Sequence, residues 1–343
     1  MALATWLPAL QKLLLLRSPH SKNRPVLAYY LHDLSPFIFE VKEGVGLRWY
    51  GLAYVLSFIL AGLLYRWLAR RGYTDLPAAQ VSDFICWAAV FGVMIGGRVG
   101  WILFYGIWMK EPDRPWYWPF EVWGGGMSSH GGIIGLVLFT LYWSRKHKVS
   151  WTGSGDCLVV VAPIGLFLVR LANFVNGELY GRPAGEPGKT ASVPWAMIFP
   201  KELPTTAVDK VTGMKDTVFS LDQIRHDEGV RTLLLEKLPP RHPSQLYEAL
   251  LEGVILFAVL WILRTRFRVP RGVLTGAFFI LYAMLRIVGE VFREPDSTWH
   301  VGPISAGQFL SIFMFFVGAA FIAFGMKRQD YERVFQQSSS SSS

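Results

Sequence analysis

The sequence predicts an all-α polytopic membrane protein with seven transmembrane helices, a small head outside the membrane and an N-terminal interfacial arm. Hydrophobic residues make up 52% of the 343 residues and charged residues 17%, whereas a typical soluble domain has about 25% charged residues. Seven apolar runs each come near the roughly 20 residues that an α-helix needs to cross a bilayer. The lysines and arginines, which give a net charge of +9, cluster between these runs. That distribution is typical of membrane topology and argues against a nucleic-acid-binding face.

The arm covers residues 1–48 and begins with the apolar stretch WLPALQKLLLLRS. This stretch is too short to span a bilayer, and no small-residue cleavage site follows it, so a cleaved signal peptide is disfavoured. An amphipathic helix lying in the membrane interface fits its composition better.

The seven predicted spans follow in order, and the third is the shortest and rich in glycine. They cover residues 49–68, 83–105, 128–143, 155–175, 245–263, 273–291 and 303–326. Four helices therefore lie within residues 49–175 and three within 245–326. The polar, proline-containing segment 176–244 between them forms the predicted head. Residues 327–343, which end in QQSSSSSS, are expected to be a disordered tail.

Clusters of basic residues set the predicted orientation. They follow the first, third, fifth and seventh spans and include Arg70, Arg71, Lys146, Arg268 and Lys327. The connections after the second and sixth spans mix acidic and basic residues. Because basic connections favour the cytoplasm, we expect the N-terminus and the head outside and the C-terminus inside.

The fourth span ends in polar residues within the stretch VRLANFVNGELYGR. Arg170, Asn173, Asn176 and Glu178 stand where the apolar run gives way to the head. Polar and ionisable groups at that depth are costly unless they face a partner or water, so they mark a candidate site. A cation and amides at the membrane boundary lie at the depth of an anionic lipid headgroup. The alternative for the two asparagines is that they cap or bridge helices.

Arg286 in the sixth span adds a second guanidinium near the same membrane boundary. Guanidinium groups match phosphate oxygens in a bidentate way, so Arg170 and Arg286 suggest an anion site. Tyr282, Arg286 and Glu290 lie within roughly 80° of one another on a helix. Two alternatives stay open: Arg286 pairs internally with Glu290, or Glu178 and Glu290 neutralise the two arginines.

His130 lies among glycines in WGGGMSSHGGIIG. Histidine is the side chain best suited to accept a proton near neutral pH, which makes it a candidate general base. The alternative is a hydrogen-bonded core histidine. A metal site is disfavoured because no second histidine or carboxylate stands at ligand spacing. Tyr50 suits an aromatic belt at the membrane interface, and a headgroup contact is its alternative.

Several other residues within apolar runs need an account. Cys86 and Cys157 suit buried small residues better than a disulfide, and nothing supports a catalytic thiol. Arg98 is expected to pair with Glu290 or Asp83, or to face a water-filled cavity. The stretch RHPSQLYEALLEG opens the fifth span, with Pro243 suited to a first helical turn and Ser244 or Glu248 supporting the helix start.

Five strings in order resemble the prolipoprotein diacylglyceryl transferase family of bacterial lipoprotein maturation. They are RWYGLAY (48–54), GGGMSSHGGIIG (124–135), RLANFVNGELYGR (170–182), RHPSQLYEA (241–249) and YAMLRIVGEVFREPD (282–296). The resemblance implies a multi-pass protein of the bacterial inner membrane with a periplasmic N-terminus and head. It implies transfer of the diacylglyceryl group of phosphatidylglycerol to the lipobox cysteine at the signal peptide of a preprolipoprotein. A thioether forms and glycerol phosphate leaves, and neither cofactor nor metal is needed.

The resemblance also implies residue roles. Catalysis is expected of His130, Arg170 and Arg286. The other functional positions of the family match Tyr50, Asn173, Glu178, Gly181, Tyr282 and Glu290, and Asn176 joins them as a substrate-binding candidate because of its place at the span end. The chain departs from the family at Arg48, where some members have histidine, and in residues 201–240, which are longer than the usual head.

The rival class is a transporter or binding protein for an anionic solute or lipid, which would use the same arginines. Such a protein is expected to show internal repeats and broken helices near the membrane midplane. The two halves of the sequence show no repeat, and the unusual polar residues gather at the predicted outer side of the membrane. They come from four segments: the starts of the first and third spans and the ends of the fourth and sixth. A purely structural scaffold would not need four polar segments at that side.

Overall fold

The computed structural model describes residues 29–42, 45–104, 106–108, 117–120, 126–202, 219–294, 300–301 and 304–334. The predicted interfacial helix at the N-terminus and the final QQSSSSSS lie outside these residues. The chain divides into two compact units. The head unit comprises Met1–Gly51, Val169–Ala249 and Val288–His300, and the bundle unit comprises Leu52–Leu168, Leu250–Ile287 and Val301–Ser343.

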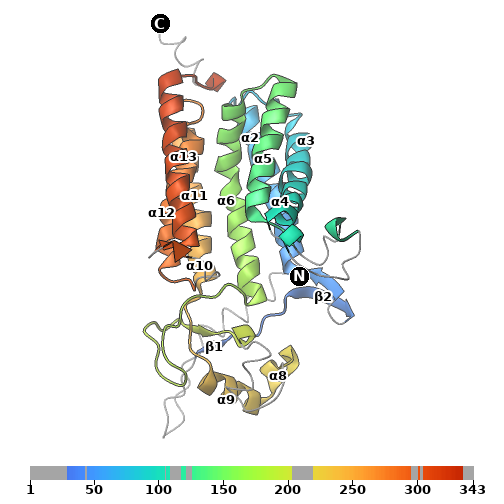
Figure 1. Cartoon of the computed structure of the whole chain (residues 1–343), viewed down its shortest axis with the longest axis vertical. Coiled ribbons are helices and arrows are strands. Elements are labelled where there is room, and N and C mark those ends of the chain that lie inside the picture. Colours follow the sequence, from blue (N-terminus) through green and yellow to red (C-terminus); the bar gives the residue numbers. More distant parts are fainter. Residues whose placement is uncertain are drawn as a thin grey trace. The chain divides into compact units, whose positions relative to one another are not determined.

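Long helices form the bundle unit, and Figure 1 shows them running along a common direction. The helical elements are α2 (Trp49–Arg70), α3 (Val81–Trp87), η2 (Ala88–Ile95), α4 (Gly96–Phe104), η3 (Gly106–Trp108), η4 (Trp118–Phe120), α5 (Ser129–His147), α6 (Trp151–Asn176), η7 (Ala249–Ile255), α11 (Leu256–Arg266), α12 (Val273–Glu290) and α13 (Ala306–Arg328). α2, α6, η7 and α12 have residues in both units, and α10 (Ser244–Glu248), which leads into η7, lies in the head unit. Both η2 and η7 are π-helical turns that continue into the neighbouring α-helices.

Six helical runs among the described residues are long and apolar enough to cross a membrane. They are Trp49–Arg70, Val81–Phe104, Trp151–Asn176, Ser244–Arg266, Val273–Glu290 and Ser311–Arg328. The prediction of a helical, polytopic membrane protein is therefore confirmed. The expected third span coincides with α5, a 19-residue helix that is not among the six, so the count of seven spans stays a prediction.

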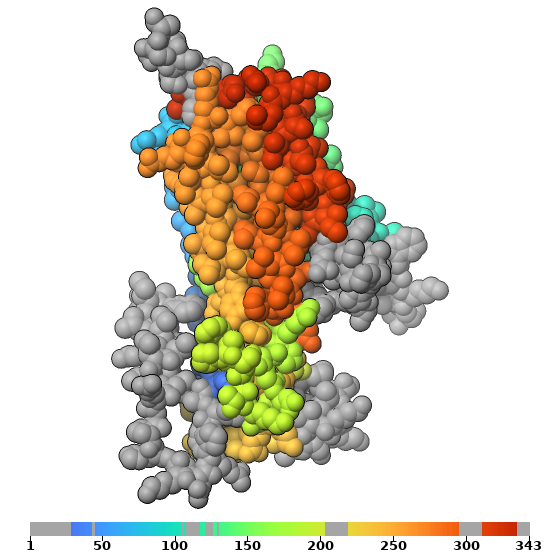
Figure 2. All heavy atoms as spheres, turned by 90° about the vertical axis from the view of Figure 1, so that its left-hand side faces the viewer, coloured from blue at the N-terminus to red at the C-terminus, as the bar shows by residue number. Residues whose placement is uncertain are grey.

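The bundle unit buries a core of aromatic and aliphatic side chains. Phe84 packs against Phe139 and Trp143, with ring centroids 6.0 and 5.7 Å apart, and Tyr65 and Leu260 are fully buried in the same core. Figure 2 shows the face of this unit formed by α11, α12 and α13, in orange to red. Exposed apolar side chains on these helices include Ile262, Met284, Ile287, Phe313 and Phe316. Such a surface suits a hydrocarbon environment.

Glycines let α5 pack directly against α4 and η2. A Cβ atom on Gly131 would lie 2.4 Å from the carbonyl oxygen of Gly96, and one on Gly135 would lie 2.4 Å from that of Gly92. Only glycine permits this backbone approach, which is typical of close helix pairs in membranes. The glycines that follow His130 therefore allow close helix packing.

The head unit combines short strands and helices. Its elements are β1 (Tyr30–Leu31), β2 (Phe37–Lys42), β3 (Val45–Arg48), β4 (Met197–Ile198), η6 (Pro200–Glu202), α8 (Leu221–His226) and α9 (Glu228–Lys237); β5 (His300–Val301) and β6 (Ile304–Ser305) follow α12. β1 pairs with β4 in parallel, and β2 and β3 form an antiparallel hairpin. Leu31, Ile198 and Leu234 contribute to a small core between these elements.

Helices α8 and α9 arise from the long segment 201–240, for which the sequence offered no motif. Ser220 and Gln223 form a capping box at the start of α8, and Asp227 caps α9 by accepting from Val230 N at 3.0 Å. These caps satisfy backbone N–H groups that a helix start leaves without partners. Local sequence therefore sets both helix starts.

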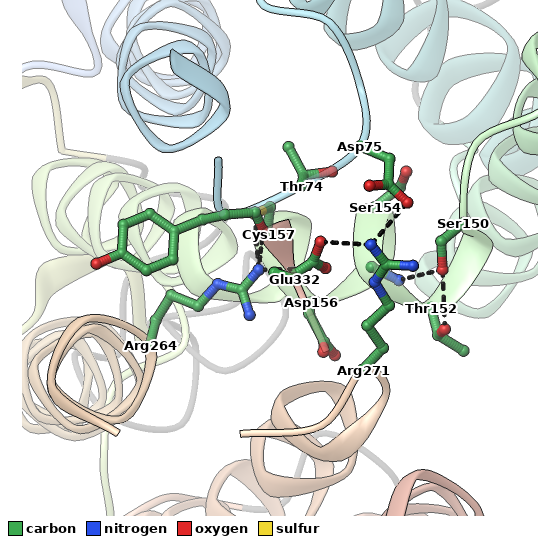
Figure 3. Close-up of polar contacts among 12 residues, drawn as sticks. Thr74, Asp75, Ser150, Thr152, Ser154, Asp156, Cys157, Arg264, Arg271 and Glu332 are labelled. Atoms are coloured by element: carbon green, nitrogen blue, oxygen red, sulfur yellow. Dashed lines mark hydrogen bonds and ion pairs between the residues drawn. The ribbon is translucent and has the colours of Figure 1, made fainter. Parts of the chain in front are cut away.

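A cluster of charged residues holds the C-terminal segment against other parts of the bundle unit (Figure 3). This C-terminal ion cluster consists of Arg264, Arg271, Asp75, Asp330 and Glu332. The fully buried Glu332 lies 3.4 Å from Arg264 and 2.9 Å from Arg271, and Arg271 also lies 2.7 Å from Asp75 and 3.2 Å from Asp330. The prediction of a disordered tail beginning at residue 327 is thus wrong for the part that the structure describes.

Candidate active site

The end of α6 gathers four of the predicted site residues in the head unit. Asn173 Nδ2 donates to Tyr50 Oη at 3.0 Å and to Glu178 Oε1 at 2.9 Å. Asn176 Nδ2 lies 3.4 Å from the same Glu178 oxygen. Gln245 Nε2 donates to the Glu178 carbonyl at 2.7 Å. These residues form one polar network, which we call the α6-end network: Tyr50, Asn173, Asn176, Glu178 and Gln245.

Three amide oxygens of this network are buried without a hydrogen-bond partner among the described residues. They are Oδ1 of Asn173, Oδ1 of Asn176 and Oε1 of Gln245, and Asn173 as a whole is 1% exposed. A buried acceptor without a donor costs roughly 1–3 kcal/mol. The network therefore has unused acceptor capacity where the sequence predicts a headgroup.

The backbone turns sharply after α6. Gly177 has φ +62° and Leu179 has φ +56°, and Gly177 N donates to the Phe174 carbonyl at 2.9 Å. A left-handed residue just after a helix is a common way to end it, and glycine adopts that conformation without strain. This turn brings Glu178 back towards Asn173, which explains their contact.

Gly181 lies where two segments of the head unit approach each other. A Cβ atom there would lie 2.4 Å from the Phe292 carbonyl oxygen and 2.6 Å from that of His242. Gly181 N donates to the His242 carbonyl at 2.9 Å. The structure thus gives Gly181 a packing role, and its expected contact with substrate stays a prediction.

Arg170 is held by a carboxylate from α10. Its Nε lies 3.1 Å from Oε2 of Glu248, and Oε1 of Glu248 lies 3.1 Å from Arg293 Nη1. Glu248 is fully buried, whereas the Arg170 side chain is 13% exposed. One carboxylate thus orients two guanidinium groups. The expectation that Glu248 supports the start of its own helix is replaced by this role, and Ser244 Oγ donates to the Leu179 carbonyl at 3.0 Å.

Arg286 has a similar counter-ion in the bundle unit. Its Nη1 lies 3.4 Å from Oε1 of Glu252, which is fully buried, while the Arg286 side chain is 18% exposed. Glu252 lies in the π-helical turn η7, and such turns are frequent at functional sites. Tyr282 stacks on Phe278 with ring centroids 5.8 Å apart. From the sequence, Glu178 and Glu290 were candidate partners of the two arginines. In the structure, Glu248 contacts Arg170 and Glu252 contacts Arg286.

His130 stands exposed in the first turn of α5. Its exposure disagrees with the alternative of a core histidine. Ser128 caps the helix by accepting from Gly131 N at 3.3 Å. Arg98 fixes the chain that precedes it, donating to the carbonyls of Trp118 at 2.5 Å, Pro119 at 2.7 Å and Gly126 at 3.1 Å.

Arg98 thus contacts backbone carbonyls, and its expected pairing with Glu290 or Asp83 stays a prediction. A guanidinium in an apolar helix needs acceptors, and backbone carbonyls of η4 and of Gly126 supply them. Glu290 itself is the half-buried last residue of α12. Among the residues that the structure describes, no group of three His, Cys, Asp or Glu side chains is placed to hold a metal ion.

The predicted site residues fall in both compact units. Arg170, Glu290, Gly181 and the α6-end network belong to the head unit, and His130, Tyr282 and Arg286 belong to the bundle unit. The joint action of Arg170 and Arg286 on one phosphate therefore stays a prediction.

Comparison with known proteins identifies the family. The sequence model described as prolipoprotein diacylglyceryl transferase matches residues 36–324. The chain belongs to the prolipoprotein diacylglyceryl transferase family. Three relatives are each named phosphatidylglycerol–prolipoprotein diacylglyceryl transferase. The one from Bdellovibrio bacteriovorus is 37% identical over 331 residues, covering 84% of this chain and 92% of that protein. The Nitrobacter hamburgensis protein is 38% identical, covering 83% and 86%, and the Gluconacetobacter diazotrophicus protein is 38% identical, covering 89% and 94%.

In this member of the prolipoprotein diacylglyceryl transferase family both cysteines are free thiols. Cys157 is buried as predicted, and its Sγ donates to the Tyr73 carbonyl at 3.1 Å. The expectation of burial is wrong for Cys86, which is exposed on α3. An apolar helix facing lipid leaves such a residue without protein neighbours, so an apolar run alone does not predict burial within the protein.

Sequence reasoning missed the counter-ion Glu252. A signal for it was present, because a carboxylate inside the apolar run LYEALLEGVIL requires a partner by the same rule that singled out Arg170. It also missed Gln245, whose neutral amide gives no comparable signal.

Proposed function

We propose that this chain transfers the diacylglyceryl group of phosphatidylglycerol to the lipobox cysteine of a preprolipoprotein in the bacterial inner membrane. The observation that carries the proposal is the end of α6. There a membrane helix of this family ends in a partly exposed arginine and a network with unused amide acceptors. The phosphate of an anionic headgroup supplies a negative charge for the arginine, and hydroxyl groups of the headgroup supply hydrogen-bond donors for the amide oxygens.

The reaction is a substitution at carbon. The thiolate sulfur of the lipobox cysteine attacks the glyceryl carbon that carries the phosphate ester. The carbon–oxygen bond breaks, the phosphate oxygen keeps the electron pair, and glycerol phosphate leaves. A carbon–sulfur thioether bond replaces the ester bond, so no oxidant or reductant is required.

Arg170 and Arg286 are assigned to the phosphate. Guanidinium groups stabilise the negative charge that grows on the leaving phosphate. Glu248 and Glu252 keep each guanidinium oriented, at 3.1 and 3.4 Å. Both arginine side chains remain partly exposed, at 13% and 18%, which leaves them accessible to a lipid.

Asn173 and Asn176 are assigned to the glycerol end of the headgroup. A hydroxyl group donates a hydrogen bond, and the Oδ1 atoms of both asparagines are buried acceptors that lack one among the described residues. Tyr50 and Glu178 hold the Asn173 amide in the required orientation. Gly181, Tyr282 and Glu290 are proposed to complete the substrate-binding set.

His130 is assigned to the thiol proton. A free cysteine has a pKa near 8.5, so at neutral pH attack requires a base. His130 is exposed at a helix start, where a second substrate can reach it. The attacking cysteine belongs to the preprolipoprotein, so neither thiol of this chain enters the reaction.

The proposed topology has seven spans, with the N-terminus and head unit in the periplasm and the C-terminus in the cytoplasm. Helix α5 serves as the seventh span, because its 19 residues extend about 28 Å, close to the thickness of a hydrocarbon core. Its last turn holds Arg145, Lys146 and His147, which suits a cytoplasmic end.

A direct transfer assay tests the proposal. The purified protein in detergent is mixed with phosphatidylglycerol and a lipobox peptide, and mass spectrometry detects a diacylglyceryl thioether on the peptide cysteine. Arg286→Ala should abolish the product, whereas Arg66→Ala, at an exposed arginine on α2, should leave it unchanged. A peptide with serine in place of cysteine should give none. Phosphatidylglycerol binding without any product would favour a lipid-binding or transport protein instead.

A further inference from the structure

His32 is a buried histidine of the head unit that the proposed reaction does not use. It follows β1 directly, and its backbone N donates to the Ile198 carbonyl at 2.8 Å, which continues the pairing of β1 with β4. The residue is 5% exposed. Its Nε2 lies 2.7 Å from the carbonyl oxygen of Phe174. A residue of the N-terminal arm thus contacts the end of α6.

The Phe174 carbonyl belongs to the last turn of α6. The last four carbonyls of a helix have no partner within it. The Phe174 oxygen accepts from Gly177 N at 2.9 Å, and the neighbouring Asn173 oxygen accepts from Glu178 N at 3.1 Å. A carbonyl only accepts, so His32 must carry its proton on Nε2 to form the 2.7 Å contact. His32 therefore fixes the turn from which Asn173 and Glu178 project.

Gly177 provides the space for the imidazole. A Cβ atom at this position would lie 2.8 Å from both Cε1 and Nδ1 of His32, and Gly177 has φ +62°. The rings of Phe174 and Phe199 enclose the imidazole, with centroids 5.6 and 5.3 Å away. Burial lowers the pKa of His32 to about 4, so the ring is neutral at neutral pH, as a single Nε2–H donor requires.

We propose that His32 is a positioning residue for the headgroup site. Its hydrogen bond holds the last turn of α6 so that Asn173 meets both Tyr50 and Glu178, at 3.0 and 2.9 Å. This inference rests on the proposed function, because it assigns the consequence of the contact to phosphatidylglycerol binding. It also explains why position 177 is a glycine. This residue must end the helix with a positive φ and leave space for the imidazole.

Two substitutions separate the hydrogen bond from packing. In His32→Phe an aromatic ring is kept and the donor is lost. In His32→Gln the amide nitrogen takes a place near that of Nε2 and restores a donor. We expect His32→Phe to raise KM for phosphatidylglycerol about tenfold, with little change in kcat, and His32→Gln to stay within about threefold of wild type. His226→Phe is the matched control, because His226 is exposed on α8 and contacts Asp222.

The measurements are transfer kinetics in mixed micelles and phosphatidylglycerol binding by native mass spectrometry. Wild-type KM in His32→Phe would overturn the proposal, as would equal loss in His32→Phe and His32→Gln. If the wild type binds phosphatidylglycerol but transfers nothing, the proposed function fails, and the binding comparison of the two variants still decides the role of His32.

A double-mutant cycle covers the case in which His32→Phe does not fold. Gly177→Ala places a methyl group against the imidazole, so it should weaken phosphatidylglycerol binding in the wild-type background. In a His32→Ala background the methyl group meets no ring, and the weakening should be smaller. Additive effects of the two substitutions would show that the two residues act independently and would overturn the proposal.

Discussion

Two regions of the molecule each contain a fully buried glutamate that pairs with two arginines. In the head unit Glu248 pairs with Arg170 and Arg293, and in the bundle unit Glu332 pairs with Arg264 and Arg271. The clearest difference lies in one arginine of each pair. Arg264 is 0% exposed, whereas Arg170 is 13% exposed beside the α6-end network; the second arginines, Arg271 and Arg293, are 10% and 7% exposed. A buried ion pair alone therefore does not mark a site, since it can equally hold a chain end in place.

The largest effect of a substitution on transfer is expected at His130, the proposed general base. His130→Ala should lower kcat for transfer by about 10³-fold, within the range for loss of a general base, while phosphatidylglycerol binding is retained. Transfer kinetics and native mass spectrometry measure the two quantities. His147→Ala is the control, since His147 stacks on Trp143 at the opposite end of α5. Loss of lipid binding in His130→Ala would show that His130 is a headgroup ligand.

The two shared carboxylates allow a matched test of their arginines. Arg170→Lys should lower kcat/KM about 10²-fold, because an ammonium group does not reproduce the fork of a guanidinium at a phosphate. Arg264→Lys should lower the unfolding temperature and leave the kcat/KM of the folded protein near wild type. Thermal unfolding and transfer rates, measured on the same preparations, check both. Comparable loss of transfer in the two variants would remove the distinction between the regions.

Acidification should lower the free energy of unfolding through His32 in the head unit and raise it through Glu332 in the bundle unit. Burial lowers the pKa of His32 to about 4, while the charge of Asp33 acts to raise it and that of Lys201 to lower it. The unfolded chain then binds the proton more tightly, so stability from His32 is present above pH 6.5 and is lost as the pH falls towards 4. Between pH 7 and 5 the loss is about 2 kcal/mol. His32→Gln should remove this part of the pH dependence.

Glu332 has the opposite sign. Burial raises its pKa to about 6, against the opposing effect of Arg264 and Arg271. The folded chain then binds the proton more tightly than the unfolded chain. Lowering the pH from 7 to 5 therefore raises the free energy of unfolding by about 1 kcal/mol through this group. Glu332→Gln should remove that gain. Denaturant unfolding of each variant at both pH values measures the two contributions, and a change of the same sign in both variants would contradict the assignment.

The two regions differ in how far the sequence could predict them. The spans follow from apolar runs, and the turn after α6 follows from Gly177 and the polar residues around it, because both signals are local. The sequence signals that Glu252, a carboxylate inside an apolar run, needs a partner, but it does not say which one. Only helix packing decides that Glu248 meets Arg170 and that Glu252 meets Arg286. Arg98 shows the same limit: its acceptors are backbone carbonyls, which every residue supplies and no sequence pattern distinguishes.

The C-terminal ion cluster lay beyond sequence reasoning for the same reason. Glu332 stands in the polar stretch RQDYERV, which resembles a solvated tail. Its burial depends on Arg264 and Arg271, which are far away in the chain and themselves read as ordinary cytoplasmic basic residues. Long-range charge pairing therefore decides which polar segments order, and composition does not reveal it.

The smallest expected effect tests the comparison most directly. Cys157 lies beside the C-terminal ion cluster, with Sγ 3.7 Å from Arg264 Nη2, and a thiol beside a guanidinium is an arrangement that can activate a nucleophile. The thiol is fully buried, so we expect Cys157→Ser, alone or with Cys86→Ser, to keep transfer within about twofold of wild type. The same mass-spectrometric assay measures it. If Cys157→Ser alone folds normally and transfers nothing, the Cys157 thiol takes part in the reaction. The cluster would then be a second reactive region, because burial would have failed to separate a structural ion cluster from a site.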